Sequence, residues 1–132
     1  MSNTKENIKR GSCPVYKKCG GCQLQNLTYT EQLNFKQKKV EKLLSKFCKA
    51  DKIIGMNTPY HYRNKVHAVV GLDKQKGIVT GTYAEGTHRL VPVDVCMIED
   101  QKADSIIATL RELFASFKYV PYNEDTHRGF MR

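Results

Sequence analysis

The sequence predicts an α+β fold, in which two helices accompany an antiparallel sheet of three or four strands and an N-terminal cysteine-rich loop. Two separated segments repeat apolar residues at the spacing of a helix, and the stretch between them alternates with the period of a strand. Short turn-forming sequences divide that stretch into strands. The length of 132 residues fits one domain.

The start of the chain is polar and differs in composition from the remainder. We expect residues 1–12 to be a flexible lead and residues 13–132 to form the folded domain. The lead lacks the apolar core of a signal peptide, and no apolar run approaches the roughly 18 residues of a membrane span. A cytoplasmic monomer with no membrane partner is therefore expected.

The first helix is predicted over residues 28–47. Thr28 and Glu31 have the spacing of a capping box at its start. One face carries the apolar residues Leu33, Val40, Leu43, Leu44 and Phe47. The other face carries the lysines Lys36, Lys38, Lys39, Lys42 and Lys46. This amphipathic pattern predicts a helix with one side in the core and a cationic side facing outward.

A first strand is predicted over residues 62–72, because Arg63, Lys65 and His67 alternate with less polar residues. This spacing would place the three basic side chains on one face of the strand. Further strands are predicted over 78–83 and 89–96.

Turns separate these strands. The sequence DKQKG at 73–77 is one turn, and AEGT at 84–87 is a hairpin turn in which Gly86 can take a positive φ. Pro92 predicts that the third strand is an edge strand or contains a bulge. Together the three strands form an antiparallel meander.

The second helix follows Asp100, which is a suitable N-cap. Its apolar residues are Ile106, Ile107, Leu110, Leu113, Phe114 and Phe117. We expect this stripe to belong to the core. The remaining tail, YVPYNEDTHRGFMR, looks like a turn followed by the start of another strand.

The five cysteines do not suggest a disulfide framework. Their number is odd, and disulfides are rare in the cytosol. Cys13, Cys19 and Cys22 are close together, and Cys96 lies far downstream. Cys48 ends the lysine-rich helix without a neighbour of ligand type, so we expect it to be outside any site.

The cysteine spacing leaves three chemistries open. Four thiolates suit an iron–sulfur cluster or tetrahedral zinc, and Cys19 with Cys22 also has the spacing of a redox CxxC pair. Three clustered ligands with a remote fourth favour a 4Fe-4S cluster over zinc, which more often uses two CxxC pairs. Gly20 and Gly21 can take left-handed angles and direct backbone N–H groups at the sulfurs.

The positive charge is concentrated in the first part of the chain. Residues 1–52 carry 12 Lys or Arg against 4 Asp or Glu, whereas residues 53–132 carry 10 against 9. A one-sided positive field indicates a polyanionic partner, of which nucleic acid is the commonest.

Three motifs in order resemble one enzyme family. "CPVYKKCGGCQLQNL", "PYHYRNKVHAVVG" and "HRLVPVDVCMIED" are similar to the RNA (uracil-5-)-methyltransferases, the RumA-like 23S rRNA enzymes with an iron–sulfur cluster. The resemblance implies that Cys13, Cys19, Cys22 and Cys96 hold a 4Fe-4S cluster. In that family the cluster supports structure and RNA binding, and the implied partner is RNA, specifically 23S rRNA.

The resemblance covers residues 13–132 and therefore only the central domain of such an enzyme. The chain shows neither the small β-barrel domain of many members nor the Rossmann-like domain that binds S-adenosylmethionine and supplies the nucleophile. We expect this chain alone to bind RNA weakly and to be inactive as a methyltransferase. S-Adenosylmethionine would bind only the missing catalytic domain. The alternative is a free-standing zinc-type nucleic-acid-binding module.

The expected RNA contacts are cations and aromatic rings. The cations are Lys17 and Lys18 in the loop, Lys36, Lys39, Lys42 and Lys46 on the helix, and Arg63 and Lys65 on the strand. His88 and Arg89 lie where they could reach the strand surface. Tyr16, Tyr29, Tyr60 and Tyr62 are candidate stacking platforms, although packing is the commoner role of tyrosine.

Overall fold

A computed structural model describes residues 10–75 and 77–130 of the chain, so most of the predicted lead, residues 1–9, lies outside the described part. The elements in chain order are α1 (Tyr29–Leu44), β1 (Val69–Asp73), β2 (Gly77–Tyr83), β3 (Leu90–Pro92) and α2 (Gln101–Ser116). The predicted α+β class, with two helices and a three-stranded antiparallel sheet, is confirmed.

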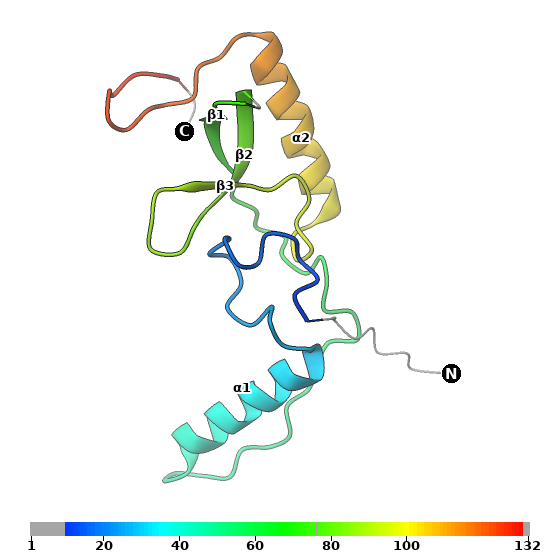
Figure 1. Cartoon of the computed structure of the whole chain (residues 1–132). Helices are drawn as coiled ribbons and strands as arrows, with labels where there is room; N and C mark the ends of the chain where they lie inside the picture. The colour runs from blue at the N-terminus through cyan, green and yellow to red at the C-terminus, as the bar shows by residue number, and fades with distance from the viewer. Residues whose placement is uncertain (1–9, 76, 131–132) are drawn as a thin grey trace.

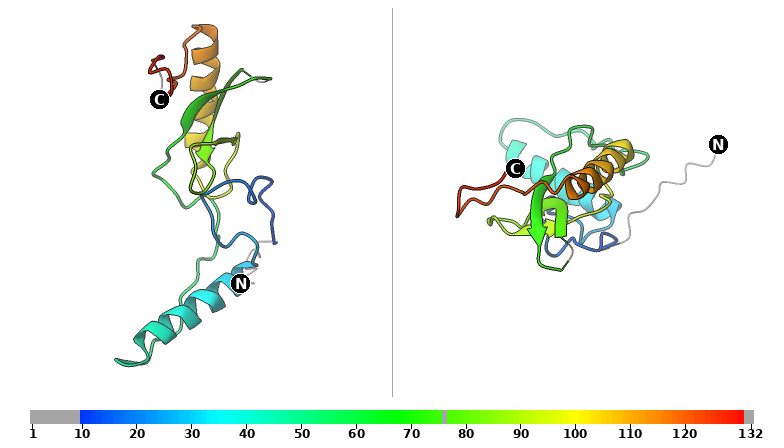
Figure 2. Two further views of the ribbon diagram at one scale, coloured as in Figure 1. Left: turned by 60° about the vertical axis from the view of Figure 1, so that its left-hand side comes forward. Right: turned by 90° about the horizontal axis from the view of Figure 1, so that it is seen from above.

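The molecule is elongated, with its two helices at different ends (Figure 1). Helix α2 runs along the sheet and contacts β2. Helix α1 projects from the opposite end, and the cysteine-rich loop lies between α1 and the sheet. The two further views show the same separation of α1 from the sheet (Figure 2). The cysteine loop therefore occupies the waist of the molecule.

The sheet is a short meander in the order β1-β2-β3. Its tightest point is Gly81, which pairs with Val69 on one side and Pro92 on the other. A Cβ at Gly81 would lie 2.0 Å from the carbonyl oxygen of Val91, so only glycine fits. β3 is an edge strand, as Pro92 predicts, and Gly86 has the expected positive φ of 66° in the hairpin turn.

The first predicted strand is wrong over its first half. Residues 62–68 form no strand, and β1 begins only at Val69. The backbone of Arg63 instead bonds with the stretch before α2: its N–H donates to Ile98 O at 2.9 Å, and its carbonyl accepts from Asp100 N at 2.9 Å. The alternating pattern correctly indicates extended chain, but its partner is this stretch and not β2. β3 is likewise shorter than the predicted 89–96.

Both predicted helix starts are confirmed. The Thr28 side chain accepts from Glu31 N, and the Glu31 carboxylate accepts from Thr28 N at 2.8 Å, which completes the capping box. Asp100 caps α2 by accepting from Lys102 N and Ala103 N. Each cap satisfies N–H groups that have no partner within the helix.

The expected core faces of the helices are wrong in large part. In α1, Leu33 and Leu44 are half-buried, but Val40 and Leu43 are exposed, as is Phe47 just beyond the helix. In α2, Ile107 and Phe114 are half-buried. The other four members of its predicted stripe, Ile106, Leu110, Leu113 and Phe117, are exposed. The buried apolar side chains among the described residues are Tyr29, Val79, Ala84, Val91 and Ile98.

Helix α1 is held by the chain that returns beside it. The Tyr29 hydroxyl accepts from Met56 N at 2.6 Å, and the Gln37 side chain accepts from Ile53 N at 2.7 Å. Gln37 also donates to Asp51 O at 3.1 Å. Polar contacts to one strap of chain thus replace the core packing that the apolar pattern predicts.

The tail forms a turn but no named strand. Asn123 and Arg128 make an isolated antiparallel bridge, so among the described residues of the tail, bridges stand in place of the predicted additional strand. Phe130 N donates to Val120 O at 3.0 Å, which folds the tail back beside the end of α2.

Candidate functional site

The cysteine loop is closed at its neck by backbone hydrogen bonds. Gly11 N donates to Gln25 O at 2.8 Å. Within the loop, the Val15 carbonyl accepts from Lys18 N and Cys19 N, both at 2.9 Å. These bonds form a compact turn that sets the positions of Cys13 and Cys19 without any contribution from the sheet.

Two glycines allow the loop to approach the sheet. Gly20 N donates to Tyr83 O at 3.2 Å, and a Cβ at Gly20 would lie 2.9 Å from Glu85 N. Gly21 N donates to Cys19 Sγ at 3.3 Å, so the predicted N–H directed at a sulfur is present. The predicted left-handed angles are wrong, because neither glycine has a positive φ. Gly20 is needed for close approach.

The distant cysteine reaches the loop from the other side. Cys96 lies between β3 and α2, and its N–H donates to Asp104 Oδ2 at 3.0 Å. The structure brings all four predicted ligands, Cys13, Cys19, Cys22 and Cys96, to the lining of one cavity of about 70 Å³. This cavity is several times larger than the space one water molecule needs.

The four cysteines share the cavity without meeting at one point. Among residues 10–75 and 77–130, no group of three or more His, Cys, Asp or Glu side chains is arranged to hold a single metal ion. His67 and Arg63 line the same cavity. The alternation predicts only an ordinary strand residue at His67, because it cannot reveal that residues 62–68 lie outside the sheet and that His67 lines the cavity.

The thiols are partly withdrawn from water. Burial raises the pKa of the Cys22 thiol, and the nearby Cys96, Cys19 and Cys13 thiols raise it further, while a contact with Gln25 lowers it. Burial also raises the pKa of the Cys96 thiol, against backbone hydrogen bonds from Ile98 and Glu99. Without a positive partner, the cavity therefore disfavours several thiolates at once.

Gln25 lies in the first of the three motifs, but no site role is predicted for it. It is buried behind Cys22, and its Nε2 lies 4.0 Å from Cys22 Sγ. Its Oε1 is buried and has no hydrogen-bond partner among the described residues. A buried amide that is half satisfied is costly, so Gln25 Oε1 is a polar atom still open to a partner.

The loop lysines border a second, open pocket. Lys17 and Lys18 line it together with Arg89, Gln23 and Asn26. Arg89 therefore reaches the loop cations and not the surface of Arg63 and Lys65. The pocket combines cations with amide groups, which together can contact phosphates and base edges.

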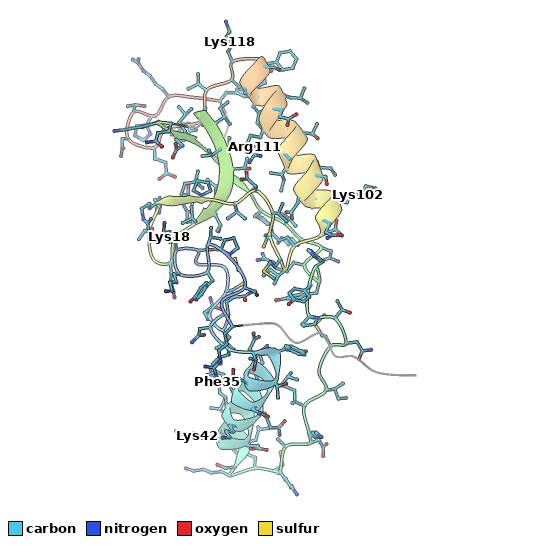
Figure 3. The ribbon with its side chains drawn as sticks, turned by 45° about the vertical axis from the view of Figure 1, so that its right-hand side comes forward. Lys18, Phe35, Lys42, Lys102, Arg111 and Lys118 are labelled. Carbon is cyan, nitrogen blue, oxygen red and sulfur yellow. The ribbon has the colours of Figure 1, made fainter. Side chains whose placement is uncertain are left out.

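The remaining predicted cations are spread over the molecule. Lys36 lines a hollow beside Cys22 and Tyr62, and Arg63 and Lys65 line another open pocket. Arg63 is partly engaged, because its guanidinium lies 3.9 Å from Glu99. Lys39, Lys42 and Lys46 are exposed along and just beyond α1, where Figure 3 labels Lys42 near the outer end of the helix.

The tyrosines differ in availability. Tyr29 is buried and bonded to Met56, so its role is structural. Tyr16 is half-buried, with Lys17 Nζ 5.8 Å from its ring centroid. Tyr62 is 52% exposed next to the cysteine cavity, and burial of its hydroxyl raises its pKa. Tyr60, like Tyr16, is half-buried, so Tyr62 is the best exposed of the four candidates to stack on a base.

The described helices include none that is both long and apolar enough to cross a membrane.

Comparison with known proteins gives a consistent set of relatives. The chain is 42% identical over 124 residues to a protein of Clostridium tetani, 40% identical over 125 residues to one of Halalkalibacterium halodurans, and 36% identical over 124 residues to one of Listeria monocytogenes. Each is named an uncharacterized RNA methyltransferase, and each match covers 91% of this chain. No protein-family model matches the chain.

The matches cover only part of the relatives. The chain spans 27% of the length of each of these three proteins. The resemblance predicted from the three motifs is thus confirmed: over nine-tenths of its length, the chain corresponds to one segment of proteins named RNA methyltransferases.

Proposed function

We propose that this chain is the iron–sulfur and RNA-binding domain of an S-adenosylmethionine-dependent uracil-5-methyltransferase of 23S rRNA. The observation that carries the proposal is that Cys13, Cys19, Cys22 and Cys96, from two distant segments, line one cavity. The relatives' names support the methyltransferase parent. In this proposal the chain acts in the cytoplasm as a monomer and is inactive without its catalytic domain.

The donor set fits a 4Fe-4S cluster better than one zinc ion. Four sulfurs around a zinc lie about 3.8 Å apart, given Zn–S bonds of about 2.3 Å and tetrahedral geometry. A cluster binds its four cysteines through four separate irons and tolerates a wider spread. Three cysteines in one loop with a fourth from a distant segment, all lining one cavity, are the donor set that favours the cluster.

Residues of the cysteine loop would serve the bound group. Gly21 N already donates to Cys19 Sγ, a bond that stabilises a thiolate. Lys17 and Lys18 lie in the adjacent pocket and offset negative charge. Cys13, Cys19, Cys22 and Cys96 would hold the cluster, which would supply positive charge that stabilises their thiolates and would tie the loop to the sheet. The cluster takes no part in methyl transfer.

The RNA would follow the cations that surround this waist. Phosphates would contact Lys17 and Lys18 on the loop, Lys36, Lys39, Lys42 and Lys46 along α1 and just beyond it, and Arg63 and Lys65 near the sheet. Unstacked bases would rest on Tyr62. These contacts hold the RNA strand while the target uridine is extruded toward the catalytic domain.

Metal analysis of anaerobically purified protein tests the cluster. We expect a brown protein with about four irons per chain. Cys96→Ser should lose the colour and the iron, while Cys48→Ser, which alters an exposed cysteine outside the cavity, should retain both. A colourless protein with one zinc would support the zinc module. A metal-free protein with reversible Cys19–Cys22 oxidation would support a redox role.

A methyl-transfer assay with labelled S-adenosylmethionine and 23S rRNA tests the expected inactivity of the isolated chain. No incorporation above background is expected. Incorporation that the 132-residue chain sustains over many turnovers would overturn this part of the proposal.

A further inference from the structure

One open pocket lies between the cysteine loop and the turn that joins β2 to β3. The loop contributes Lys17 and Lys18 to its lining, and the turn contributes Glu85 and Arg89. Figure 3 labels Lys18 beside this hairpin. Three cations against one carboxylate give the lining a positive balance, which attracts phosphate. The pocket volume of about 450 Å³ lies in the range of sites that hold small organic molecules.

Arg89 is the guanidinium of this pocket, and it differs from the arginines that pair within the chain. Arg10, Arg63 and Arg111 each form an ion pair with a carboxylate. Among residues 10–75 and 77–130, no ion pair or side-chain hydrogen bond engages the Arg89 guanidinium. Its backbone is fixed, because Ala84 N donates to Arg89 O at 2.9 Å across the turn. Arg89 is therefore held in place with its planar donor fork available to a ligand.

A buried acceptor lines the same pocket. Gln25 is 7% exposed, and its Oε1 has no hydrogen-bond partner in the described part of the chain. Gln25, Cys19 and Cys22 line both this pocket and the cysteine cavity, so they form a wall between the two. A ligand that brings a hydrogen-bond donor to this wall would offset the cost of the open acceptor.

The polar groups of the pocket match a guanine base. Guanine presents two adjacent acceptors, O6 and N7, which suit the two parallel N–H groups of an arginine such as Arg89. Its other edge carries the N1–H and N2–H donors, for which the Glu85 carboxylate and Gln25 Oε1 are acceptors in the lining. None of the other three bases offers a pair of acceptors on one edge and a pair of donors on another.

We propose that this pocket holds one unpaired guanosine nucleotide of the RNA, with its phosphate at Lys17 and Lys18 and its base at Arg89. The half-buried Tyr16, which also lines the pocket, supplies a ring on which the base can stack. The inference rests on the proposed function, because it names one nucleotide that the RNA-binding domain recognises. This guanosine is distinct from the target uridine, and it lies against the wall that the pocket shares with the cysteine cavity.

Binding of short single-stranded RNAs to the anaerobically purified chain tests this site. A fluorescein-labelled uridine hexamer with one guanosine should bind about tenfold more tightly than the all-uridine hexamer, measured by fluorescence anisotropy. Arg89→Lys keeps the charge but loses the planar fork, so it should remove this preference and leave the affinity for the all-uridine hexamer nearly unchanged. Arg128→Lys, at an exposed arginine of the tail, is the matched control and should keep the preference.

The outcomes separate this site from the proposed function. Equal affinity for the two hexamers, or a guanosine preference that Arg89→Lys leaves intact, would overturn the guanosine site while RNA binding itself stands. Tighter binding of a hexamer with one adenosine or cytidine than of the guanosine hexamer would also overturn it. A chain that holds iron but binds neither the hexamers nor a 23S rRNA fragment would overturn both the site and the proposed RNA-binding role.

A second measurement locates the guanosine without any substitution. A hexamer that carries 8-azidoguanosine should crosslink on illumination to a peptide from residues 16–26 or 84–89, as read by mass spectrometry. The same hexamer with an excess of unlabelled guanosine hexamer should lose that crosslink. Crosslinks only to α1, to the surface of Arg63 and Lys65 or to the tail would place the base elsewhere and overturn the site.

Discussion

The two helices of this chain are alike in length and capping but differ in their surroundings. Each has 16 residues and a side-chain N-cap. α2 lies on the sheet, where Arg111 reaches both Thr80 and Asp94. α1 projects away from the sheet and is held by a strap of chain that includes Ile53 and Met56 (Figure 1).

The difference shows that apolar residues at helical spacing predict a helix but not what will cover its apolar face. Both segments repeat apolar residues every three or four positions, yet much of each apolar set is exposed. The charges on the two helices differ. α1 carries exposed lysines on the face opposite its apolar residues, whereas satisfied hydroxyls flank the apolar residues of α2. The cationic face of α1 suits a polyanion.

The largest loss of stability is expected where β2 and β3 approach most closely, at Gly81. Gly81→Ala places a Cβ 2.0 Å from the Val91 carbonyl, so β2 and β3 must separate. We expect a loss of about 3 kcal/mol in the free energy of unfolding, measured by urea denaturation. Gly71→Ala is the matched control, because its Cβ meets only the movable end of Leu90. Equal losses in the two variants would contradict the close approach at Gly81.

The attachment of α2 to the sheet depends on Arg111. Its guanidinium donates to Thr80 Oγ1 at 3.3 Å and to Asp94 Oδ1 at 2.5 Å, and Thr80 is 3% exposed. Arg111→Ala should lower the free energy of unfolding by about 1–2 kcal/mol, because the buried hydroxyl loses its partner. Lys39→Ala on α1 should change it by less than about 0.5 kcal/mol. A similar cost for both would mean that α2 is no better anchored than α1.

The lysines of α1 and the lysine at the start of α2 should have different effects on RNA binding, because only α1 carries a row of exposed lysines. Lys39→Ala and Lys42→Ala on α1 should each weaken binding to a 23S rRNA fragment and flatten the salt dependence by about 0.7 in slope per lost phosphate contact. Lys102→Ala on α2 should leave the slope unchanged. The measurement is fluorescence anisotropy at several salt concentrations, and an equal change for all three lysines would remove the distinction.

The smallest expected effect is the pH dependence at the start of α1. The Glu31 side chain accepts from Arg10 Nε at 3.1 Å and from the Thr28 cap, and these bonds lower its pKa from 4.5 to about 2. Because the folded-state pKa is the lower one, Glu31 stabilises the fold above about pH 4.5. That stability is lost as the pH falls toward 2.

Thermal unfolding of Glu31→Gln should show this difference. The variant should unfold at a lower temperature than the parent at pH 7, and the gap should close by pH 2. The effect is small because both partners are exposed to solvent. Glu41→Gln on the same helix is the control and should show little change. A gap that persists at pH 2 would assign the effect to something other than the charge.

Local signals in the sequence are reliable, and signals that depend on a distant partner are not. The caps at Thr28 and Asp100 and the turn at Gly86 involve neighbours in the chain, and all three are confirmed. The strand predicted over 62–72 is wrong over residues 62–68, because alternation does not say which segment will pair with them. The apolar stripes fail as core because periodicity cannot state whether a covering element is present.

Residues of the candidate site can be predicted from the sequence only where they belong to a motif or to the family resemblance. Cys13, Cys19 and Cys22 stand out through their spacing, while Cys96 can be included because it lies within a recognisable motif. Gln25 belongs to the first of the three motifs, but its place behind the cysteines becomes clear only once its burial is known. Arg89 joins Lys17 and Lys18 only because the hairpin of β2 and β3 folds toward the loop.

The closed neck of the cysteine loop has a consequence for the order in which the chain assembles. The bonds that close it, from Gly11 to Gln25 and from Arg10 to Glu31, span short stretches of chain and need no part of the sheet. Short closures lose little entropy and form early. During synthesis, three cysteines can thus be in position on the emerging chain while Cys96 is still inside the ribosome. Cys96 joins the other three cysteines only once the β2–β3 hairpin has folded, so a complete set of four thiols requires a formed sheet.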